Sequence, residues 1–310
     1  MRNQGSSSLR ILWATVLIAG LTGSLPGLPL YAQSPAQPTL VWEQTLNGED
    51  DSKLRWPIGV SSAAEDEILV ADGYRDRLVL FRKGTGGAGW KAEKVVSLPA
   101  TPRAVATDGQ RYLVALAQAG AVFAVERPTL QLRRLSVPTE VMPGPLSARS
   151  DGTIVLVDAA TSRILLLAAG GDLQSQIRVT GSINSIAAGS SGDYFVASAQ
   201  PAEIRRYAGS GELLGSWTPP ILNQEQPWPG GIAVESGGTV YVSDRQSGRI
   251  LALDASSGAL IGTGSRRGWE SGLLNRPAGL AILGNGRIAV ADQGNGRVQI
   301  FRQIEQKFGQ

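Results

Sequence analysis

The sequence predicts an all-β fold, a six-bladed β-propeller whose blades are four-stranded antiparallel sheets, with an N-terminal strand closing the last blade. The first observation behind this prediction is a strand-like run that ends in Asp and is followed five positions later by Arg and a second apolar run. It occurs in four copies, at Asp72 and Arg77, Asp158 and Arg163, Asp244 and Arg249, and Asp292 and Arg297. Short strands that repeat at about 40–50 residues are typical of propeller blades.

The second observation is a marker, rich in Pro and Gly, that lies about 15 residues ahead of each strand end. It begins at positions 57, 102, 143, 183, 229 and 277, so its spacing is 40–48 residues. The second and fourth units keep their apolar runs but have lost the Asp and the Arg. Leu116 and Ala121 stand at those two positions in the second unit, and Ser198 and Glu203 in the fourth. The chain therefore contains six units.

The third observation is that the last unit lacks an outer strand of its own. The chain is polar after Arg302, whereas an apolar segment, Leu40 to Leu46, precedes the first marker. We expect residues 40–46 to pair with Gln299 to Arg302 and close the ring, because closure removes the unpaired edges of an open sheet.

Each unit is expected to contain four strands. The innermost begins at the marker and carries small residues, since six such strands converge on one axis; the second ends at the Asp, and the third begins at the Arg. Gly and Asn in the intervening hairpins supply the positive φ that tight turns need. The outer strands are expected near 93–98, 130–136, 173–179, 212–217 and 259–262. The corresponding blades are about 56–99, 100–138, 139–181, 182–228, 229–275 and 276–302.

The first 32 residues have the pattern of a secretory signal peptide. Arg2 and Arg10 precede the apolar run Ile11 to Leu21, and small Ala32 stands before the expected cleavage site. An apolar core of 11 residues is too short to span a bilayer, which needs about 20. We predict a signal peptide at 1–32, a linker at 33–39, the propeller at 40–302 and a polar tail at 303–310. The exported protein is then periplasmic or secreted, with no membrane span.

The repeated motif resembles the NHL repeat. Its pattern here is Pro-x-Gly-Leu/Ile-Ala, a hairpin, Ile/Val-x-Val-Ala/Ser-Asp, and then Arg followed by an apolar run. Gly268 to Phe301 is the best copy, and the resemblance covers about residues 56–302. It implies a propeller fold. NHL propellers include enzymes, RNA-binding proteins and protein-interaction scaffolds, so the resemblance does not imply one function.

The composition argues against catalysis. The chain contains no histidine and no cysteine, so it lacks the commonest general base, the commonest zinc ligand and a thiol nucleophile. The peptidylglycine amidating lyase and the streptogramin lyase, which this fold resembles, depend on histidine, so neither activity transfers. Gluconolactonase-like propellers hold a cation with acidic and amide side chains near the inner strands. The corresponding positions here are Ile58, Arg103, Gly144, Asn184, Gly230 and Ala278. We therefore expect no catalytic residue, metal or cofactor.

Net charge disfavours nucleic acid as a partner. Loss of Arg2 and Arg10 with the signal peptide lowers the basic residues from 29 to 27, against 26 acidic ones. A nearly neutral chain lacks the positive field that attracts nucleic acid.

The repeated Asp and Arg residues are expected to have a structural role, because one active site cannot use four equivalent positions. The Asp can accept backbone N–H groups of its turn, and the Arg five positions later can pair with the same carboxylate through two hydrogen bonds. The structural set is Asp72, Arg77, Asp158, Arg163, Asp244, Arg249, Asp292 and Arg297.

Ligand binding is expected on the face formed by the connections that enter the inner strands and those that follow each Asp. Trp, Tyr and Arg are enriched at binding hot spots, and this face carries several. The candidates are Trp56, Tyr74, Arg75, Arg103, Asn184, Trp228, Arg245 and Trp269. The alternative is that Trp56 and Trp228 pack over the ends of neighbouring blades.

Two function classes remain. The first is a non-catalytic extracytoplasmic binding or scaffold protein that recognises a protein, peptide or glycan through this face. The second is an extracytoplasmic lyase or hydrolase with a histidine-free, carboxylate-metal site in the propeller channel.

Overall fold

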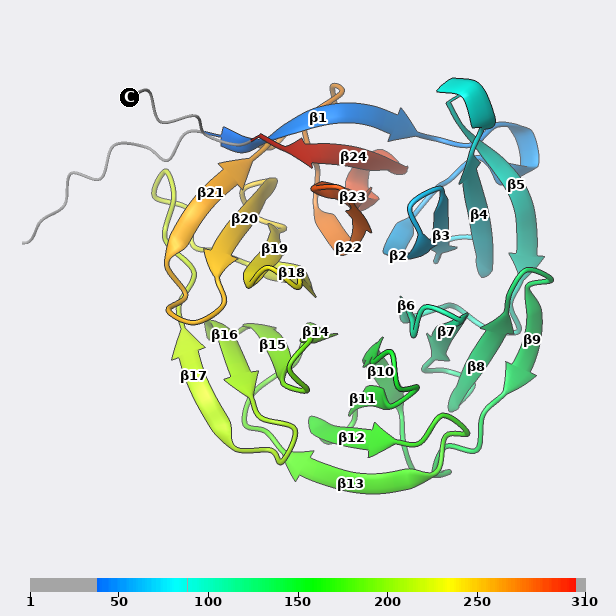
Figure 1. Cartoon of the computed structure of the whole chain (residues 1–310), viewed down its shortest axis with the longest axis vertical. Helices are drawn as coiled ribbons and strands as arrows, with labels where there is room; N and C mark the ends of the chain where they lie inside the picture. Colours follow the sequence, from blue (N-terminus) through cyan, green and yellow to red (C-terminus); the bar gives the residue numbers. More distant parts are fainter. Residues whose placement is uncertain (1–37, 88, 305–310) are drawn as a thin grey trace, which may run out of the picture. The chain divides into compact units, whose positions relative to one another are not determined.

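The computed structural model describes residues 38–87 and 89–304, and this part of the chain is all-β. It contains the strands β1 to β24 and three short 3-10 segments, η1 (Asp50–Ser52), η2 (Thr85–Gly87) and η3 (Gln293–Asn295). Figure 1 shows the strands as blades arranged in a ring. No helix in the described ranges is long and apolar enough to cross a membrane. The predicted signal peptide and the end of the polar tail lie outside the described residues.

Four blades are separate four-stranded antiparallel sheets, each ordered as in the sequence. The first contains β2 (Pro57–Ala64), β3 (Glu67–Asp72), β4 (Arg77–Lys83) and β5 (Trp90–Ser97), and the second β6 (Ala104–Thr107), β7 (Arg111–Leu116), β8 (Ala121–Glu126) and β9 (Gln131–Arg134). The third contains β10 (Pro143–Ala148), β11 (Ile154–Asp158), β12 (Arg163–Leu167) and β13 (Leu173–Arg178), and the fourth β14 (Ser185–Ala188), β15 (Tyr194–Ala199), β16 (Ala202–Tyr207) and β17 (Leu213–Trp217). The first four of the five expected outer strands are present in these sheets, with ends shifted by a few residues.

The rest of the ring is one eight-stranded sheet, ordered β18-β19-β20-β21-β1-β24-β23-β22. Its strands are β18 (Pro229–Val234), β19 (Thr239–Asp244), β20 (Arg249–Asp254), β21 (Leu260–Gly264), β22 (Pro277–Gly284), β23 (Arg287–Asp292), β24 (Arg297–Gln303) and β1 (Pro38–Leu46). β1 pairs antiparallel with β24, from Leu40 opposite Gln303 to Leu46 opposite Val298, as expected from the missing outer strand (Figure 1).

The predicted boundaries of this closing strand were too narrow. β1 begins at Pro38, inside the expected linker, and β24 extends to Gln303. The extra residues give β1 a second partner, because Pro38 and Leu40 pair in parallel with Thr263 and Gly264 of β21. The N-terminal strand therefore joins two neighbouring units instead of completing only one.

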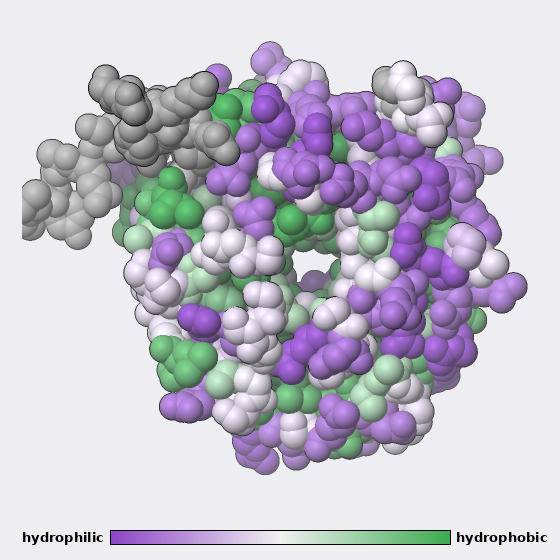
Figure 2. All heavy atoms as spheres, in the orientation of Figure 1, coloured by the Kyte–Doolittle hydropathy of each residue, from purple (hydrophilic) through white to green (hydrophobic). Residues whose placement is uncertain are grey.

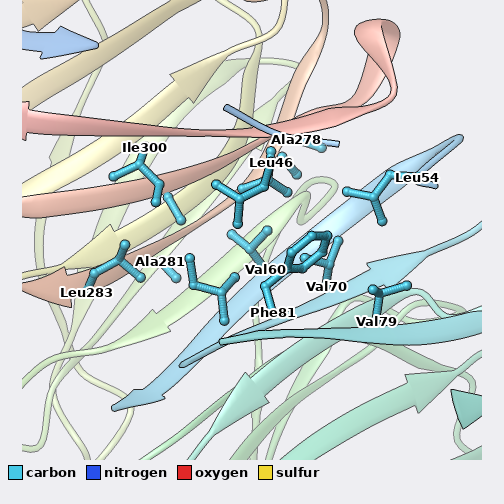
Figure 3. Packing of buried hydrophobic residues seen from close by; sticks show 14 residues of the cluster. Leu46, Leu54, Val60, Val70, Val79, Phe81, Ala278, Ala281, Leu283 and Ile300 are labelled. Carbon is cyan, nitrogen blue, oxygen red and sulfur yellow. The ribbon is translucent and has the colours of Figure 1, made fainter. Parts of the chain in front are cut away.

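The core is divided among six apolar clusters, each made by two neighbouring sequence units. The second strand of a unit contributes to both of its clusters because alternate side chains point to opposite faces: Ile68 and Val70 of β3 enter one cluster, and Leu69 and Ala71 enter the next. Figure 3 shows the cluster at the closure, where Leu46 of β1, Phe81 of β4 and Ile300 of β24 are buried together.

Marker glycines allow neighbouring inner strands to approach closely. A Cβ on Gly231 would lie 2.4 Å from the carbonyl oxygen of Ala278, and one on Gly279 would lie 2.8 Å from the Cα of Gly59. Both contacts are too short for real atoms, so these positions require glycine. The small residues of the marker therefore serve packing between blades.

The repeated Asp attaches the chain that enters a blade to the strand end of the same blade. Asp72 accepts the backbone N–H of Trp56 (2.8 Å), and Asp292 accepts that of Asn275 (2.7 Å). Asp158 and Asp244 accept the corresponding N–H groups of Met142 and Trp228. Asp158 and Asp244 also accept N–H groups two residues later, which is the expected turn geometry.

Arg completes this attachment in three of the four units. Nε and Nη2 of Arg77 both donate to one oxygen of Asp72, at 3.0 and 2.9 Å, instead of one to each oxygen as expected. Asp158 pairs with Arg163 and Asp292 with Arg297 through single hydrogen bonds.

The predicted pair of Asp244 and Arg249 is wrong, because these two residues form no ion pair. The hydroxyl of Ser247 donates to Asp244 at 2.6 Å and takes the oxygen that the Arg uses in the other units. Nε of Arg249 is buried without a hydrogen-bond partner among the described residues.

A substitute for the missing pair occurs in the fourth unit. Arg205 donates to the hydroxyl of Ser198 (2.9 Å), which stands at the Asp position, and to the carbonyl of Thr180 (2.7 Å) in the entering chain. Arg205 lies two residues beyond Glu203, which stands at the Arg position of the repeat.

Candidate functional site

One end of the ring carries the connections named in the sequence analysis. Backbone hydrogen bonds join the two kinds of connection within a blade, from Gly73 to Trp56 and from Arg245 to Trp228. At the centre of this end is a cavity of about 480 Å³, which we call the channel mouth. Its lining includes the starts of inner strands together with Arg103, Asn184, Trp228, Arg245 and Gln293. Figure 2 shows an opening at the centre of the ring.

Four of the eight predicted binding residues therefore meet at one cavity. Arg103 and Asn184 enter from the connections that precede β6 and β14, and Trp228 from the one before β18. Arg245 comes from the connection between β19 and β20. Trp228 is 42% exposed and lines the cavity.

Positive charge is concentrated at the channel mouth. Its lining contains Arg103 and Arg245 and no Asp or Glu. Burial, followed by the positive charges of Arg276 and Arg103, lowers the pKa of Arg245. Arg103 is exposed to water at the surface. Its pKa is nevertheless lowered by burial, because the walls of the mouth surround the side chain with protein. Two arginine side chains without an acidic neighbour in the lining therefore share the channel mouth.

The local structure directs Arg245 toward the axis. A Cβ on Gly230 would lie 2.7 Å from Cγ of Arg245, so the glycine leaves room for the arginine stem. The side-chain oxygen of Gln293, itself buried, accepts a hydrogen bond from Nη2 of Arg245 at 2.7 Å. Asn184 is held at the rim because its amide donates to the carbonyl of Pro229 (2.9 Å).

The inner boundary of the channel mouth is apolar. Behind it lies a second cavity of about 210 Å³, whose lining includes the hydroxyls of Ser61, Ser62, Thr107 and Ser147. Six side chains line both cavities, one from the innermost strand of each sequence unit. This channel ring consists of Val60, Val105, Leu146, Ile186, Ile232 and Leu280.

A second group of predicted residues forms a separate surface cavity of about 470 Å³, lined by Arg55, Trp56, Tyr74 and Arg75. We call it the outer patch. Trp56 is 42% and Tyr74 74% exposed, so neither is part of a core. Trp269 is 79% exposed and lines neither cavity. The predicted binding residues are thus divided among three places instead of forming one continuous site.

The donor set does not fit a resident cation. Residues 38–87 and 89–304 contain no group of three acidic side chains that could hold a metal ion. The channel mouth offers the amide oxygens of Asn184 and Gln293, but the two arginines beside them would repel a cation.

The sequence analysis did not include Arg55, Arg276 and Gln293 among the binding residues. Arg276 was detectable, since it precedes the sixth marker just as Trp56 and Trp228 precede the first and fifth. Its backbone has a left-handed φ of 49°, which non-glycine residues rarely adopt. Gln293 gave no such signal, because its role is to hold Arg245.

Comparison with known proteins supports the repeat and the fold. Residues 274–301 match the family model of the NHL repeat, which confirms the resemblance found in the sequence. No curated protein sequence matches the chain.

Solved structures with the same fold share little sequence with this chain. A structural genomics protein of unknown function from Bacteroides thetaiotaomicron is 12% identical over 83% of this chain and 73% of its own, with a TM-score of 0.64. A catalytically inactive virginiamycin B lyase from Staphylococcus aureus, solved with quinupristin, is 14% identical over 87% and 89%, with a TM-score of 0.59. Hydrazine synthase from Kuenenia stuttgartiensis is 12% identical over 82% and 97%, also with a TM-score of 0.59. At these identities the likeness shows the fold alone.

Proposed function

We propose that the protein is a non-catalytic extracytoplasmic binding protein that recognises a protein, peptide or glycan ligand through the end of the propeller that carries the channel mouth and the outer patch. The observation behind this proposal is the concentration of arginine and exposed aromatic side chains in two cavities at this end. Such side chains bind partners through stacking and forked hydrogen bonds without performing chemistry.

The same geometry disfavours the lyase or hydrolase alternative. The S. aureus structure bears the name of a lyase, and its inactive form has a histidine replaced by alanine. The present chain has no histidine at any position. A carboxylate-metal site would need acidic side chains at the channel, and the lining of the mouth contains none.

We further interpret the eight-stranded sheet as two blades joined edge to edge, which makes the propeller six-bladed. One blade is β18 to β21, and the other is β22 to β24 with β1. Only two residue pairs join β21 to β1, with an irregularity between them, whereas six join β1 to β24. The six apolar clusters are consistent with this count.

Export is part of the proposal and is tested by mass. The mature chain is expected to begin near Gln33, after loss of the predicted signal peptide. Mass spectrometry of the exported protein should show a chain without Met1 to Ala32. A product that retains these residues would contradict the extracytoplasmic assignment.

Binding is tested with the exported protein on peptide and glycan arrays. Wild type is compared with the double variant Trp56→Ala and Arg75→Ala, which truncates the outer patch, and with the control Arg302→Ala, an exposed residue of β24. We expect reproducible ligands for wild type and the control and weaker signals for the double variant. If wild type retains no ligand, or if the double variant binds equally well, this use of the outer patch is wrong.

A further inference from the structure

We propose that the channel mouth is a binding site for an organic oxyanion, a carboxylate or a phosphate, whose apolar body points inward to the channel ring. The proposal rests on the ligand-binding function above and names the ligand chemistry at the centre of the binding end. Arg103 and Arg245 supply the charge, and the six apolar side chains of the channel ring supply the apolar surface.

Charge is the first reason. Three of the four arginines of the repeat, Arg77, Arg163 and Arg297, are each paired with a carboxylate of their own blade. Within the part of the chain that the structure describes, no carboxylate lines the mouth beside Arg103 and Arg245. Like charges held together in a partly desolvated cavity destabilise the free protein, and an anion bound between them removes this repulsion.

Geometry is the second reason. A guanidinium group presents a planar set of N–H donors that matches two oxygens of a carboxylate or phosphate. Gln293 engages Nη2 of Arg245 from one side, and Gly230 makes space for its stem. The side chain is therefore positioned before any ligand arrives, which lowers the entropic cost of binding.

Size and polarity are the third reason, and they exclude a bare inorganic ion as the best ligand. The mouth, at about 480 Å³, lies within the range of small-molecule sites. Its inner boundary is the apolar channel ring, whereas its rim carries the arginines and the half-exposed indole of Trp228. An anion with an apolar group satisfies both regions, because its charge stays at the rim and its body displaces water from the ring.

The experiment uses the exported protein and four small probes: phenylacetate, phenyl phosphate, inorganic phosphate and the uncharged phenylacetamide. Binding is followed by calorimetric titration and by the intrinsic tryptophan fluorescence of the protein. We expect the two aromatic anions to bind more tightly than inorganic phosphate, and phenylacetamide to give no saturable signal. The stronger of the two aromatic anions distinguishes a carboxylate ligand from a phosphate ligand.

Variants assign the site. Arg103→Gln and Arg245→Gln should each weaken binding by about tenfold or more, because each loses a charge-assisted hydrogen bond. Arg245→Lys should recover only part of the affinity, because the ammonium keeps the charge and lacks the fork. Arg302→Gln, which changes an exposed arginine of β24 that lines neither the mouth nor the outer patch, is the matched control and should leave affinity unchanged. Circular dichroism of each variant confirms that it is folded.

Three outcomes overturn the proposal: equal binding of phenylacetate and phenylacetamide, no binding of any anion at millimolar concentration, or an equal loss in Arg302→Gln. If none of the probes binds, the oxyanion site is wrong, but array ligands that depend on Trp56 and Arg75 would still support the wider binding function. Loss of those array ligands, with the probes still binding, contradicts the wider function and not the oxyanion site. The two proposals therefore fail separately.

Discussion

Substitution of Asp292 by Ala should destabilise the protein far more than the same substitution at Asp244, although the two residues are equivalent in the repeat. Asp292 is fully buried and accepts hydrogen bonds from the backbone of Asn275 (2.7 Å) and from the side chains of Asn295 (2.8 Å), Arg297 (2.7 Å) and Gln299 (2.9 Å). Asp244 receives only neutral donors, because its repeat arginine is not paired with it.

The two magnitudes follow from these donors. Asp292→Ala leaves a nearly buried guanidinium without its counterion, a change that costs about 3–5 kcal/mol in buried pairs. Asp244→Ala leaves neutral donors unsatisfied, which costs about 1–3 kcal/mol. At about 2 °C per kcal/mol, the unfolding midpoint should fall by about 6–10 °C and about 2–6 °C respectively.

Thermal unfolding followed by circular dichroism measures the difference. Asp151→Ala is the control, because Asp151 is exposed in a turn and accepts one backbone N–H, from Thr153. It should change the free energy of unfolding by less than about 1 kcal/mol. Equal losses at Asp244 and Asp292, or a larger loss at Asp244, would refute the assignment of the stabilisation to the Arg pair.

Three further predictions concern closure, packing and acid stability. Deletion of residues 33–47 removes the hydrogen bonds of β1 and the buried side chains of Leu40 and Leu46. It should lower the free energy of unfolding by several kcal/mol, out of a total of about 5–15 kcal/mol. An unchanged midpoint in thermal unfolding would contradict the role of β1 in closure. Gly231→Ala should destabilise the protein by about 1–3 kcal/mol through overpacking. Gly237→Ala should be nearly neutral, because a Cβ there would meet nothing within 4 Å. Equal unfolding midpoints for the two variants would contradict the packing explanation. Burial raises the pKa of Glu67, but hydrogen bonds from Tyr112 and Arg127 outweigh it and the net pKa is lowered. Glu67 therefore contributes stability that is present above its ordinary pKa and is lost as the pH falls through the lower pKa of the folded state. Glu67→Gln should make the loss of stability toward acid shallower, as measured by urea unfolding at pH 3–6. An identical dependence on pH in the variant and the wild type would contradict this role.

Much of the fold could be predicted because its signals are local. A carboxylate that ends one strand and an arginine that begins the next stand directly opposite each other, as Asp72 and Arg77 do, so their spacing alone indicated a tight reversal. The missing outer strand of the last unit likewise predicted its replacement by residues 40–46. The parallel contact between β1 and β21 could not be predicted, because it depends on how far two strands extend past each other in space.

The side-chain pairing inside the repeats was less predictable than the repeat itself. Arg249 occupies the position of Arg77 and Arg297, yet the hydroxyl of Ser247 takes its place beside Asp244. Arg205 attaches the entering chain in a unit whose consensus residues are absent. In both units the outcome depends on how the neighbouring side chains meet in space, which a spacing pattern does not encode.

The sequence by itself determined the six repeated units, their strands and the end of the molecule that would carry arginine and aromatic residues, because hydrogen-bonding and turn preferences act between residues close in the chain. Only the tertiary structure decided which of those residues meet. Arg103, Asn184 and Arg245 belong to different units, and they converge because the ring brings the connections of separate blades to one axis. The outer patch separates from the channel mouth for the same reason, since Trp56, Tyr74 and Arg75 belong to a single unit and meet on its outer surface.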